Sequence, residues 1–254
     1  MSQLVLWHGW GMHPAAWDGL TAQIRSQHGM QFGTQLNIQA PPLPGYAGTS
    51  APTAYTLDSL VDSMLADVSA PITLCGWSLG AMLALHAARR HPDQIARLIL
   101  IGATPSFVQR ADWPHGMTRQ ALAEFTETVE NDPSTARKRF IALFNQNDIN
   151  ARSIVRTLAL TAAELPPAPR LAAGLALLRD TDLRALLPGI NQPTLLLHGA
   201  HDPLMPLAAA EWIAATLPQV RLEVLPDAAH APFLSDAARC AALIADFLMD
   251  SIDA

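Results

Sequence analysis

Gly76-Trp77-Ser78-Leu79-Gly80 places one serine between two glycines, directly after the apolar run Ile72-Thr73-Leu74-Cys75. This run predicts a buried strand, and residues 81–90 beyond it have the periodicity of a helix. A serine on such a strand-to-helix corner is held in a strained backbone with its hydroxyl exposed. Side chains in place of the two glycines would collide with the neighbouring strand and helix. The stretch therefore predicts a nucleophile, Ser78, at the end of a core strand.

Apolar runs that predict strands alternate with helical patterns on both sides of this corner. Strands are expected at 4–7, 72–75, 98–101, 194–198 and 222–225, and helices at 15–26, 57–68, 81–90, 207–217 and 236–249. Such alternation implies right-handed β-α-β crossovers and a mostly parallel sheet covered by helices on both faces. The expected fold class is therefore α/β.

The middle of the chain differs, because residues 112–186 contain no convincing strand. This segment is rich in Ala, Leu and Arg, and its helical pattern is broken at Asp132-Pro133 and again at residues 166–169. We expect an all-helical insertion at 111–186, a cap or lid over the carboxyl edge of the sheet. The α/β core is then expected at 1–110 and 187–254. Ligands bind at that edge in open α/β folds.

The composition is that of a globular protein, with half of the 254 residues apolar and 15% charged. No apolar run reaches the roughly 18 residues of a membrane span. The start of the sequence has neither the basic segment nor the cleavage site of a signal peptide. Two cysteines predict neither a disulfide framework nor a metal site, so we expect a cytoplasmic protein. The net charge of −6 argues against nucleic acid as a partner.

A serine hydroxyl is a weak nucleophile and needs a base, usually a histidine oriented by a carboxylate. His230 lies in a loop after the last expected strand, and Asp202 lies just after the preceding strand. Catalytic side chains are usually displayed on such loops. The order Ser78, Asp202, His230 is also the order expected of α/β-hydrolases. We predict that these three residues form a catalytic triad.

Other roles remain open for these and neighbouring residues. Asp202 precedes a proline and could simply cap the next helix. His201 could serve as base or orienting partner, although its neighbour Asp202 would make it point elsewhere. We expect His86 and His91 to be surface or packing residues, and His198, at the end of a strand, to be structural.

The negative oxygen of an acyl-transfer intermediate needs hydrogen-bond donors, normally backbone N–H groups. The N–H of Leu79, at the start of the helix, is one candidate. The second is expected from the loop after the first strand, His8-Gly9-Trp10-Gly11, with Trp10 as the donor. Trp10 would also place an aromatic wall beside the scissile bond. The alternative is that His8-Gly9 is only a tight turn.

Together these pieces resemble the α/β-hydrolase superfamily across nearly the whole chain. More narrowly, the sequence is similar to the BioH-type pimeloyl-[acyl-carrier protein] methyl ester esterases of biotin synthesis. The narrower resemblance rests on residues 8–11, 76–80, 105–107, 112–114, 139–143 and 228–233. The chain departs from the superfamily in three ways. It begins on the usual third strand, it has Ala81 where a glycine is common, and its Pro42–Ser50 loop lacks an aspartate.

The resemblance implies hydrolysis of the methyl ester of pimeloyl carried on acyl-carrier protein, with release of methanol. It implies the triad above, with Trp10 and Leu79 forming the oxyanion hole and flanking the substrate, and Phe140 lining the acyl channel. Phe144, one helical turn on, could extend that wall, or either phenylalanine could be plain packing. No metal or organic cofactor is expected, and the enzyme is expected to be a monomer.

The resemblance also gives a use to a basic stretch within this acidic protein. Arg139, Arg152 and Arg156 resemble the family's docking face for the acidic carrier protein, and arginine suits phosphate recognition. A merely solvated face is the alternative. The rival functions are a general short-chain carboxylesterase, a carbon–carbon bond hydrolase or a lyase on the same scaffold. A non-catalytic binding protein of this fold is a further rival.

Overall fold

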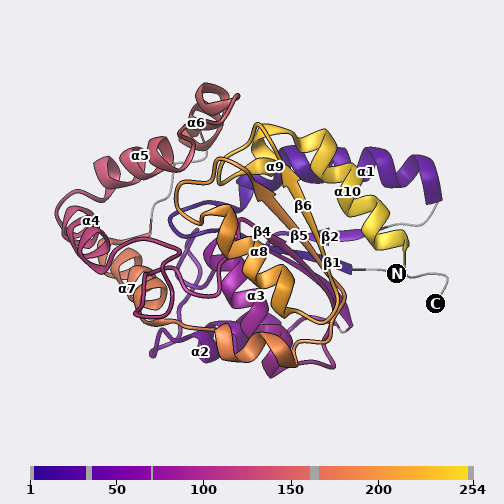
Figure 1. Cartoon of the computed structure of the whole chain (residues 1–254), viewed down its shortest axis with the longest axis horizontal. Helices are drawn as coiled ribbons and strands as arrows, with labels where there is room; N and C mark the ends of the chain where they lie inside the picture. The colour runs from indigo at the N-terminus through magenta and orange to yellow at the C-terminus, as the bar shows by residue number, and fades with distance from the viewer. Residues whose placement is uncertain (1–2, 33–35, 70, 161–165, 251–254) are drawn as a thin grey trace.

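The central element is a parallel sheet with the strand order β2-β1-β3-β4-β5-β6. The computed structural model describes residues 3–32, 36–69, 71–160 and 166–250, and Figure 1 shows the sheet in the middle of this part of the chain. The strands in chain order are β1 Gln3–Trp7, β2 Asn37–Gln39, β3 Ile72–Trp77, β4 Ile95–Ile101, β5 Thr194–Gly199 and β6 Val220–Leu225. The α/β class is confirmed, as are all five predicted strands.

The strands follow from the apolar runs that form them. Every residue of β3 and β5 is buried, because helices cover both faces of a parallel sheet. The sequence did not predict β2, which is three residues long and has exposed polar residues at both ends. It pairs only with β1 and closes one edge of the described sheet.

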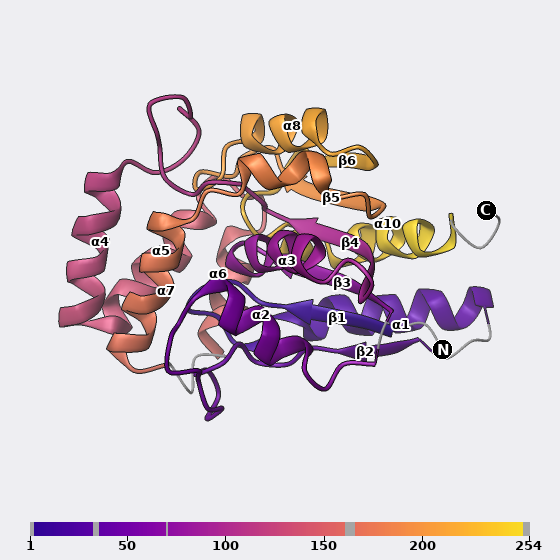
Figure 2. The ribbon, with the colours of Figure 1, turned by 90° about the horizontal axis from the view of Figure 1, so that it is seen from below.

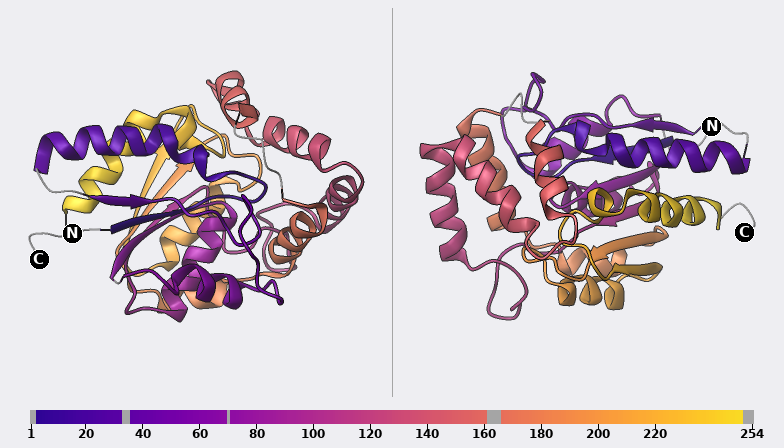
Figure 3. Two further views of the ribbon diagram at one scale, coloured as in Figure 1. Left: turned by 180° about the vertical axis from the view of Figure 1, so that it is seen from behind. Right: turned by 90° about the horizontal axis from the view of Figure 1, so that it is seen from above.

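Two layers of helices enclose the sheet. Helices α1, Asp18–Phe32, and α10, Ala237–Met249, lie side by side on one face (Figure 3). Helices α2, Leu57–Leu65, α3, Leu79–Arg90, and α8, Leu207–Thr216, cover the other face (Figure 1). Two of these helices begin at an N-cap. Thr56 forms a capping box with Ser59 at the start of α2, and the Asp236 side chain accepts from the N–H of Arg239 at the start of α10.

Within the described residues, four α-helices stand between β4 and β5 in the sequence, and we call residues 119–180 the helical insertion. They are α4 Arg119–Asn131, α5 Pro133–Phe144, α6 Ala151–Leu160 and α7 Ala168–Asp180. Figure 2 shows α4, α5 and α7 gathered at the end of the sheet to which the strand arrows point. The predicted break at Asp132-Pro133 separates α4 from α5, because the Asp132 side chain caps α5 and Pro133 is its first residue. Residues 161–165 of the expected insertion lie outside the described residues.

Three short helical segments complete the described chain. They are η1 Pro14–Trp17, η2 Arg184–Gly189 and α9 Pro232–Ser235. In the described ranges, no helix combines the length and the apolar character that crossing a membrane requires. The strand register brings Trp77, Ile101 and Leu197 to neighbouring positions at the carboxyl edge. The residues that follow them are thereby brought together.

Candidate active site

Ser78 occupies the corner between β3 and α3 in a backbone conformation that non-glycine residues rarely adopt. Its φ is 58° and its ψ is −118°. The strain is held in place because the N–H of Ser78 donates to the carbonyl of Ile101 at 3.0 Å. The carbonyl of Ser78 in turn accepts from Ala81 and Met82 in the first turn of α3. This is the sharp strand-to-helix turn that displays a nucleophile.

The two glycines beside this corner are required by close backbone packing. A Cβ on Gly76 would overlap the carbonyl group of Gly80, and a Cβ on Gly80 would overlap the carbonyl oxygen of Trp7. Both contacts are to backbone, which cannot move aside as a flexible side chain would. The predicted collision with the neighbouring strand and helix is therefore confirmed.

His230 and Asp202 form a buried hydrogen-bonded pair. Nδ1 of His230 lies 2.7 Å from Oδ2 of Asp202, while Oδ1 of Asp202 accepts from the N–H groups of Leu204 and Met205, both at 2.9 Å. Burial acts to raise the pKa of the Asp202 carboxyl, but the His230 and His198 rings and these N–H donors lower it, and the net shift is downward. The carboxylate is thus charged and fixes the proton of His230 on Nδ1. Nε2 of His230, the nitrogen that would act as general base, is buried and makes no hydrogen bond to a described residue, Ser78 included.

Ser78 and His230 both lie against the end of β4. Ile101 holds the backbone of Ser78, and the next residue, Gly102, lies against the histidine. A Cβ on Gly102 would come within 3.0 Å of Nδ1 of His230. The indole N–H of Trp77, which precedes the serine, donates to the carbonyl of His230 at 2.9 Å. The structure therefore brings all three predicted triad residues to one edge of the sheet.

The segment 8–12, which we call the oxyanion loop, turns beside the serine. A Cβ on Gly9 would lie 3.2 Å from Cβ of Ser78. The N–H of Met12 donates to the carbonyl of Gly9, and the N–H of Gly11 donates to the Tyr46 hydroxyl. No hydrogen bond from the N–H of Trp10 or of Leu79 is seen among the residues that the structure describes. Both groups therefore remain candidates for oxyanion donors.

His8 orients this loop through both of its ring nitrogens. Nδ1 donates to the carbonyl of Gly9 at 2.8 Å, and Nε2 accepts from the N–H of Leu43 at 3.0 Å. In a trans peptide the N–H points away from the carbonyl. By holding the carbonyl of Gly9, His8 therefore directs the N–H of Trp10 to the opposite side. Burial lowers the pKa of His8 to about 4, so the ring is neutral near pH 7.

This shift predicts how the stability depends on pH. His8 titrates near 6.5 in the unfolded chain and near 4 in the folded one, so protonation opposes folding. The contribution of the neutral His8 ring to the free energy of unfolding is fully present above pH 6.5 and is lost as the pH falls through 4. The expected loss is about 3 kcal/mol in the free energy of unfolding. Urea unfolding at pH 7 and pH 4.5 checks this: His8→Asn should flatten the slope, whereas His201→Asn, at an exposed histidine, should not.

A row of aromatic rings links the oxyanion loop to the histidine. The ring centroids are 5.2 Å apart for Trp10 and Phe140, 5.3 Å for Phe140 and Phe144, and 5.5 Å for Phe144 and His230. Phe140 and Phe144 are one turn apart on α5, as their spacing predicted. The indole N–H of Trp10 donates to the carbonyl of Leu171 in α7. The helical insertion therefore supplies an apolar wall directly beside the candidate site.

His198, His86 and His91 have partners of their own. Nε2 of His198 donates to the carbonyl of Met205 at 2.7 Å, and burial lowers the pKa of this ring. His201 is exposed. His86 lies 2.6 Å from Asp58 and His91 lies 2.8 Å from Asp62, at the contact of α3 with α2. Asp202 does not cap the next helix, because α8 follows Pro206 without a side-chain cap. Its Oδ1 binds N–H groups of the turn after β5, and its Oδ2 contacts His230.

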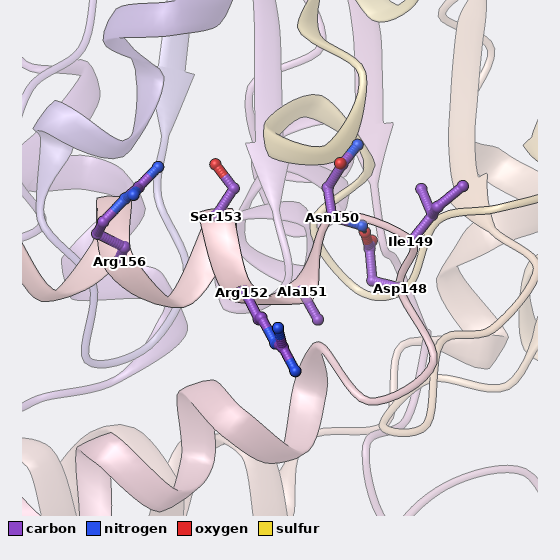
Figure 4. A pocket seen from close by; sticks show the side chains of 7 residues that line it. All are labelled: Asp148, Ile149, Asn150, Ala151, Arg152, Ser153 and Arg156. Atoms are coloured by element: carbon purple, nitrogen blue, oxygen red, sulfur yellow. The ribbon is translucent and has the colours of Figure 1, made fainter.

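Two of the three predicted docking arginines line one hollow on the helical insertion. The hollow has a volume of about 570 Å³ and is lined by Asp148, Ile149, Asn150, Ala151, Arg152, Ser153 and Arg156. In Figure 4 the side chain of Arg156 points to the same side of α6 as those of Ser153 and Asn150, and that of Arg152 points to the other side. Arg139 is exposed on α5 and does not line the hollow. None of the triad residues lines it either.

Four residues around the site were not predicted to act there. His8 and Tyr46 hold the oxyanion loop. His8 belongs to the stretch that was predicted to supply the Trp10 donor, and Tyr46 belongs to the Pro42–Ser50 loop. Arg137 and Asp148 bind backbone groups of the core from the helical insertion. The sequence offered a signal for Asp148, which is the only acidic residue in the basic stretch, residues 137–156. Within the described ranges, no three His, Cys, Asp or Glu side chains could hold a metal ion together.

Comparison with known proteins identifies the family of the chain. A model of the alpha/beta hydrolase family matches residues 4–243. A pimeloyl-[acyl-carrier protein] methyl ester esterase of Aromatoleum aromaticum is 43% identical over 251 residues, which cover 96% of this chain and 96% of that protein. A protein of the same name from Nitrosomonas europaea is 35% identical over 234 residues, which cover 91% of this chain and 90% of that protein.

A solved structure supports the fold independently. The esterase from Exiguobacterium antarcticum superposes with a TM-score of 0.87 over 98% of this chain and 92% of that one. At 24% identity, this likeness concerns the fold alone. The closer relatives carry the narrower grouping. The chain therefore belongs to the alpha/beta hydrolase family, and within it to the group of the pimeloyl-[acyl-carrier protein] methyl ester esterases.

Proposed function

We propose that this protein is a serine carboxylesterase that hydrolyses the methyl ester of pimeloyl-acyl-carrier protein. The products are pimeloyl-acyl-carrier protein and methanol, and the reaction belongs to biotin biosynthesis. The observation that carries the reaction type is the 2.7 Å contact of His230 with Asp202 at the edge that also holds the strained Ser78. The substrate rests on the relatives, which carry that name at up to 43% identity.

In the proposed reaction, Nε2 of His230 takes the proton of Ser78 as the hydroxyl oxygen attacks the ester carbonyl carbon. The N–H groups of Trp10 and Leu79 bind the negative oxygen of the tetrahedral intermediate. The carbon–methoxy bond then breaks, and the proton on His230 passes to the leaving oxygen to give methanol. Water, deprotonated by His230, attacks the acyl-enzyme and releases the acid and free Ser78. Asp202 stays ionised throughout and stabilises the protonated ring.

Substrate access is assigned to the helical insertion. We propose that residues 111–186 act as a cap over a core made of 1–110 and 187–254. Phe140 and Phe144 are assigned to the wall of the acyl channel, which their contacts with Trp10 and His230 support. Arg139, Arg152 and Arg156 are assigned to docking of the acidic carrier protein. We also propose a cytoplasmic monomer, in keeping with two cysteines that are both buried free thiols.

The docking assignment predicts a selective defect. Arg152→Ala/Arg156→Ala is expected to lower kcat/KM for methyl pimeloyl-acyl-carrier protein by about tenfold, mainly through association with the carrier. Hydrolysis of free dimethyl pimelate should be unchanged, because neither arginine contacts the triad. Arg25→Ala, at an exposed arginine on α1, serves as the control and should leave both rates unaltered. Equal loss on both esters, or none on either, would contradict the docking assignment.

The substrate itself is tested by genetics and by rates together. Expression of this chain should restore growth without biotin to a bacterium that lacks its own pimeloyl-carrier methyl esterase. A general short-chain carboxylesterase or a carbon–carbon bond hydrolase of the same fold would not restore growth. A non-catalytic binding protein would in addition show no esterase activity on any substrate.

A further inference from the structure

Two buried charged side chains are carried by this region, Arg137 within helix α5 and Asp148 in the turn after it. Arg137 is 4% exposed and Asp148 is 6% exposed. Each of them reaches out of the helical insertion to a backbone group of the core. Burying an ionised group costs free energy unless hydrogen bonds satisfy it.

Arg137 holds the oxyanion loop. Its Nε donates to the carbonyl of Gly11 at 2.8 Å, and its Nη2 donates to the carbonyl of Leu158 in α6 at 3.1 Å. It makes no ion pair with any residue in the described ranges. Burial accordingly lowers the pKa of its guanidinium from the usual value. Both of these charge-assisted hydrogen bonds go to backbone carbonyls. One of the two carbonyls belongs to Gly11, which directly follows Trp10.

Asp148 holds the loop that carries His230, residues 226–231, which we call the histidine loop. Its Oδ2 accepts from the N–H of Ala229 at 2.8 Å, directly before His230. Its Oδ1 accepts from the N–H of Asn150 at 2.7 Å and from the Ser235 hydroxyl at 2.8 Å. Both oxygens of the carboxylate are therefore satisfied, and one of them fixes the peptide next to the predicted base.

Further hydrogen bonds connect the end of α5 and the turn after it to the histidine loop and to α9. The N–H of His230 donates to the carbonyl of Phe144 at 3.2 Å, and the N–H of Ile149 donates to the carbonyl of Asp227 at 3.0 Å. The side-chain amide of Asn150 donates to the carbonyl of Ser235. The end of α5 and the turn after it are thus connected to the histidine loop by several hydrogen bonds.

We propose that Arg137 and Asp148 are positioning residues through which the helical insertion holds the oxyanion loop and the histidine loop in their working geometry. The insertion is then part of the catalytic frame as well as a cover for the substrate. This inference rests on the proposed function, because it takes the N–H of Trp10 as an oxyanion donor and His230 as the base. It extends that proposal to two residues that contact neither the substrate nor the reacting atoms.

The test uses p-nitrophenyl acetate, an ester too small to need the acyl wall or the carrier protein. Arg137→Met and Asp148→Ala should each lower kcat ten- to a hundredfold, since a displacement of about 1 Å in a catalytic group costs rates of that order. KM should stay within about twofold, because substrate binding is not changed. Asp148→Asn, which keeps one acceptor oxygen, and Arg137→Lys, which keeps one donor, should recover part of the loss.

Matched controls separate positioning from plain stability. Lys138→Met changes the exposed neighbour of Arg137 on the same helix, and Ser235→Ala removes one partner of Asp148 while its bond to Ala229 stays. Both controls should retain the wild-type kcat. Active sites are counted by burst titration with a fluorophosphonate, so every kcat refers to folded, reactive molecules only.

The outcomes distinguish the two levels of proposal. If the wild type neither reacts with the fluorophosphonate nor hydrolyses p-nitrophenyl acetate, the proposed function fails and this inference falls with it. If the wild type is active and Arg137→Met and Asp148→Ala have its kcat per titrated site, only the present inference is overturned. It is also overturned if Ser235→Ala loses as much kcat per site as Asp148→Ala. A selective loss of kcat per site in the two variants, partly restored by the conservative changes, supports it.

Discussion

Ser78→Ala is expected to lower kcat for ester hydrolysis by about 10⁶-fold, the loss that follows removal of a triad nucleophile. The residual activity is that of the oxyanion donors and of binding, which remain in place. The fold should survive, because the interactions of Ser78 that define the corner are made by its backbone N–H and carbonyl. Alanine must adopt the same positive φ of 58°, so the strain of the corner is unchanged.

Steady-state hydrolysis of methyl pimeloyl-acyl-carrier protein and of dimethyl pimelate measures this effect. Ser26→Ala, at an exposed serine on α1, is the matched control and should have wild-type rates. Circular dichroism should show the same helical signal for both variants. A folded Ser78→Ala protein that keeps even one hundredth of the wild-type kcat would rule out Ser78 as the nucleophile.

Asp202→Asn is expected to lower kcat by about 10⁴-fold, as the corresponding change does in serine proteases. Asparagine can keep Oδ1 toward Leu204 and Met205, so the turn after β5 is preserved. Its amide nitrogen then faces Nδ1 of His230, where the carboxylate oxygen Oδ2 was. Nδ1 must become an acceptor, so the ring proton moves to Nε2 and the histidine can no longer take a proton from Ser78.

The comparison variant is Asp227→Asn, which neutralises an exposed carboxylate in the histidine loop without touching a side-chain partner of His230. It should retain the wild-type kcat, and both variants should have the wild-type KM for dimethyl pimelate. If Asp202→Asn and Asp227→Asn had equal rates, Asp202 would serve only to bind the turn after β5 and would not act as a member of the triad.

The sheet and its carboxyl edge could be predicted because their signals are local. Buried parallel strands give continuous apolar runs, and the glycines at 76 and 80 mark a corner where backbones approach too closely for a side chain. The edge strand β2 could not be predicted. Its three residues carry two exposed polar side chains, so it has neither an apolar run nor an alternating pattern long enough to detect.

Some residues of the candidate site could likewise be predicted from the sequence, and others could not. The triad follows from chain order and loop position, since residues after neighbouring parallel strands reach the same edge. The roles of Arg137 and Asp148 depend on contacts between segments 126 and 81 residues apart, for which the sequence has no local sign. The basic stretch could be seen, but its division into buried Arg137 and exposed Arg139 required the packing of α5.

The most direct test of the central claim is to inhibit and map the enzyme in one experiment. The protein is treated with a fluorophosphonate, digested and analysed by mass spectrometry, and the same sample is assayed for methanol release from methyl pimeloyl-acyl-carrier protein. We predict one adduct per chain, located on Ser78, and loss of methanol release in proportion to labelling. Methanol release that persists in protein fully labelled at Ser78, or activity lost without an adduct on Ser78, would contradict the account.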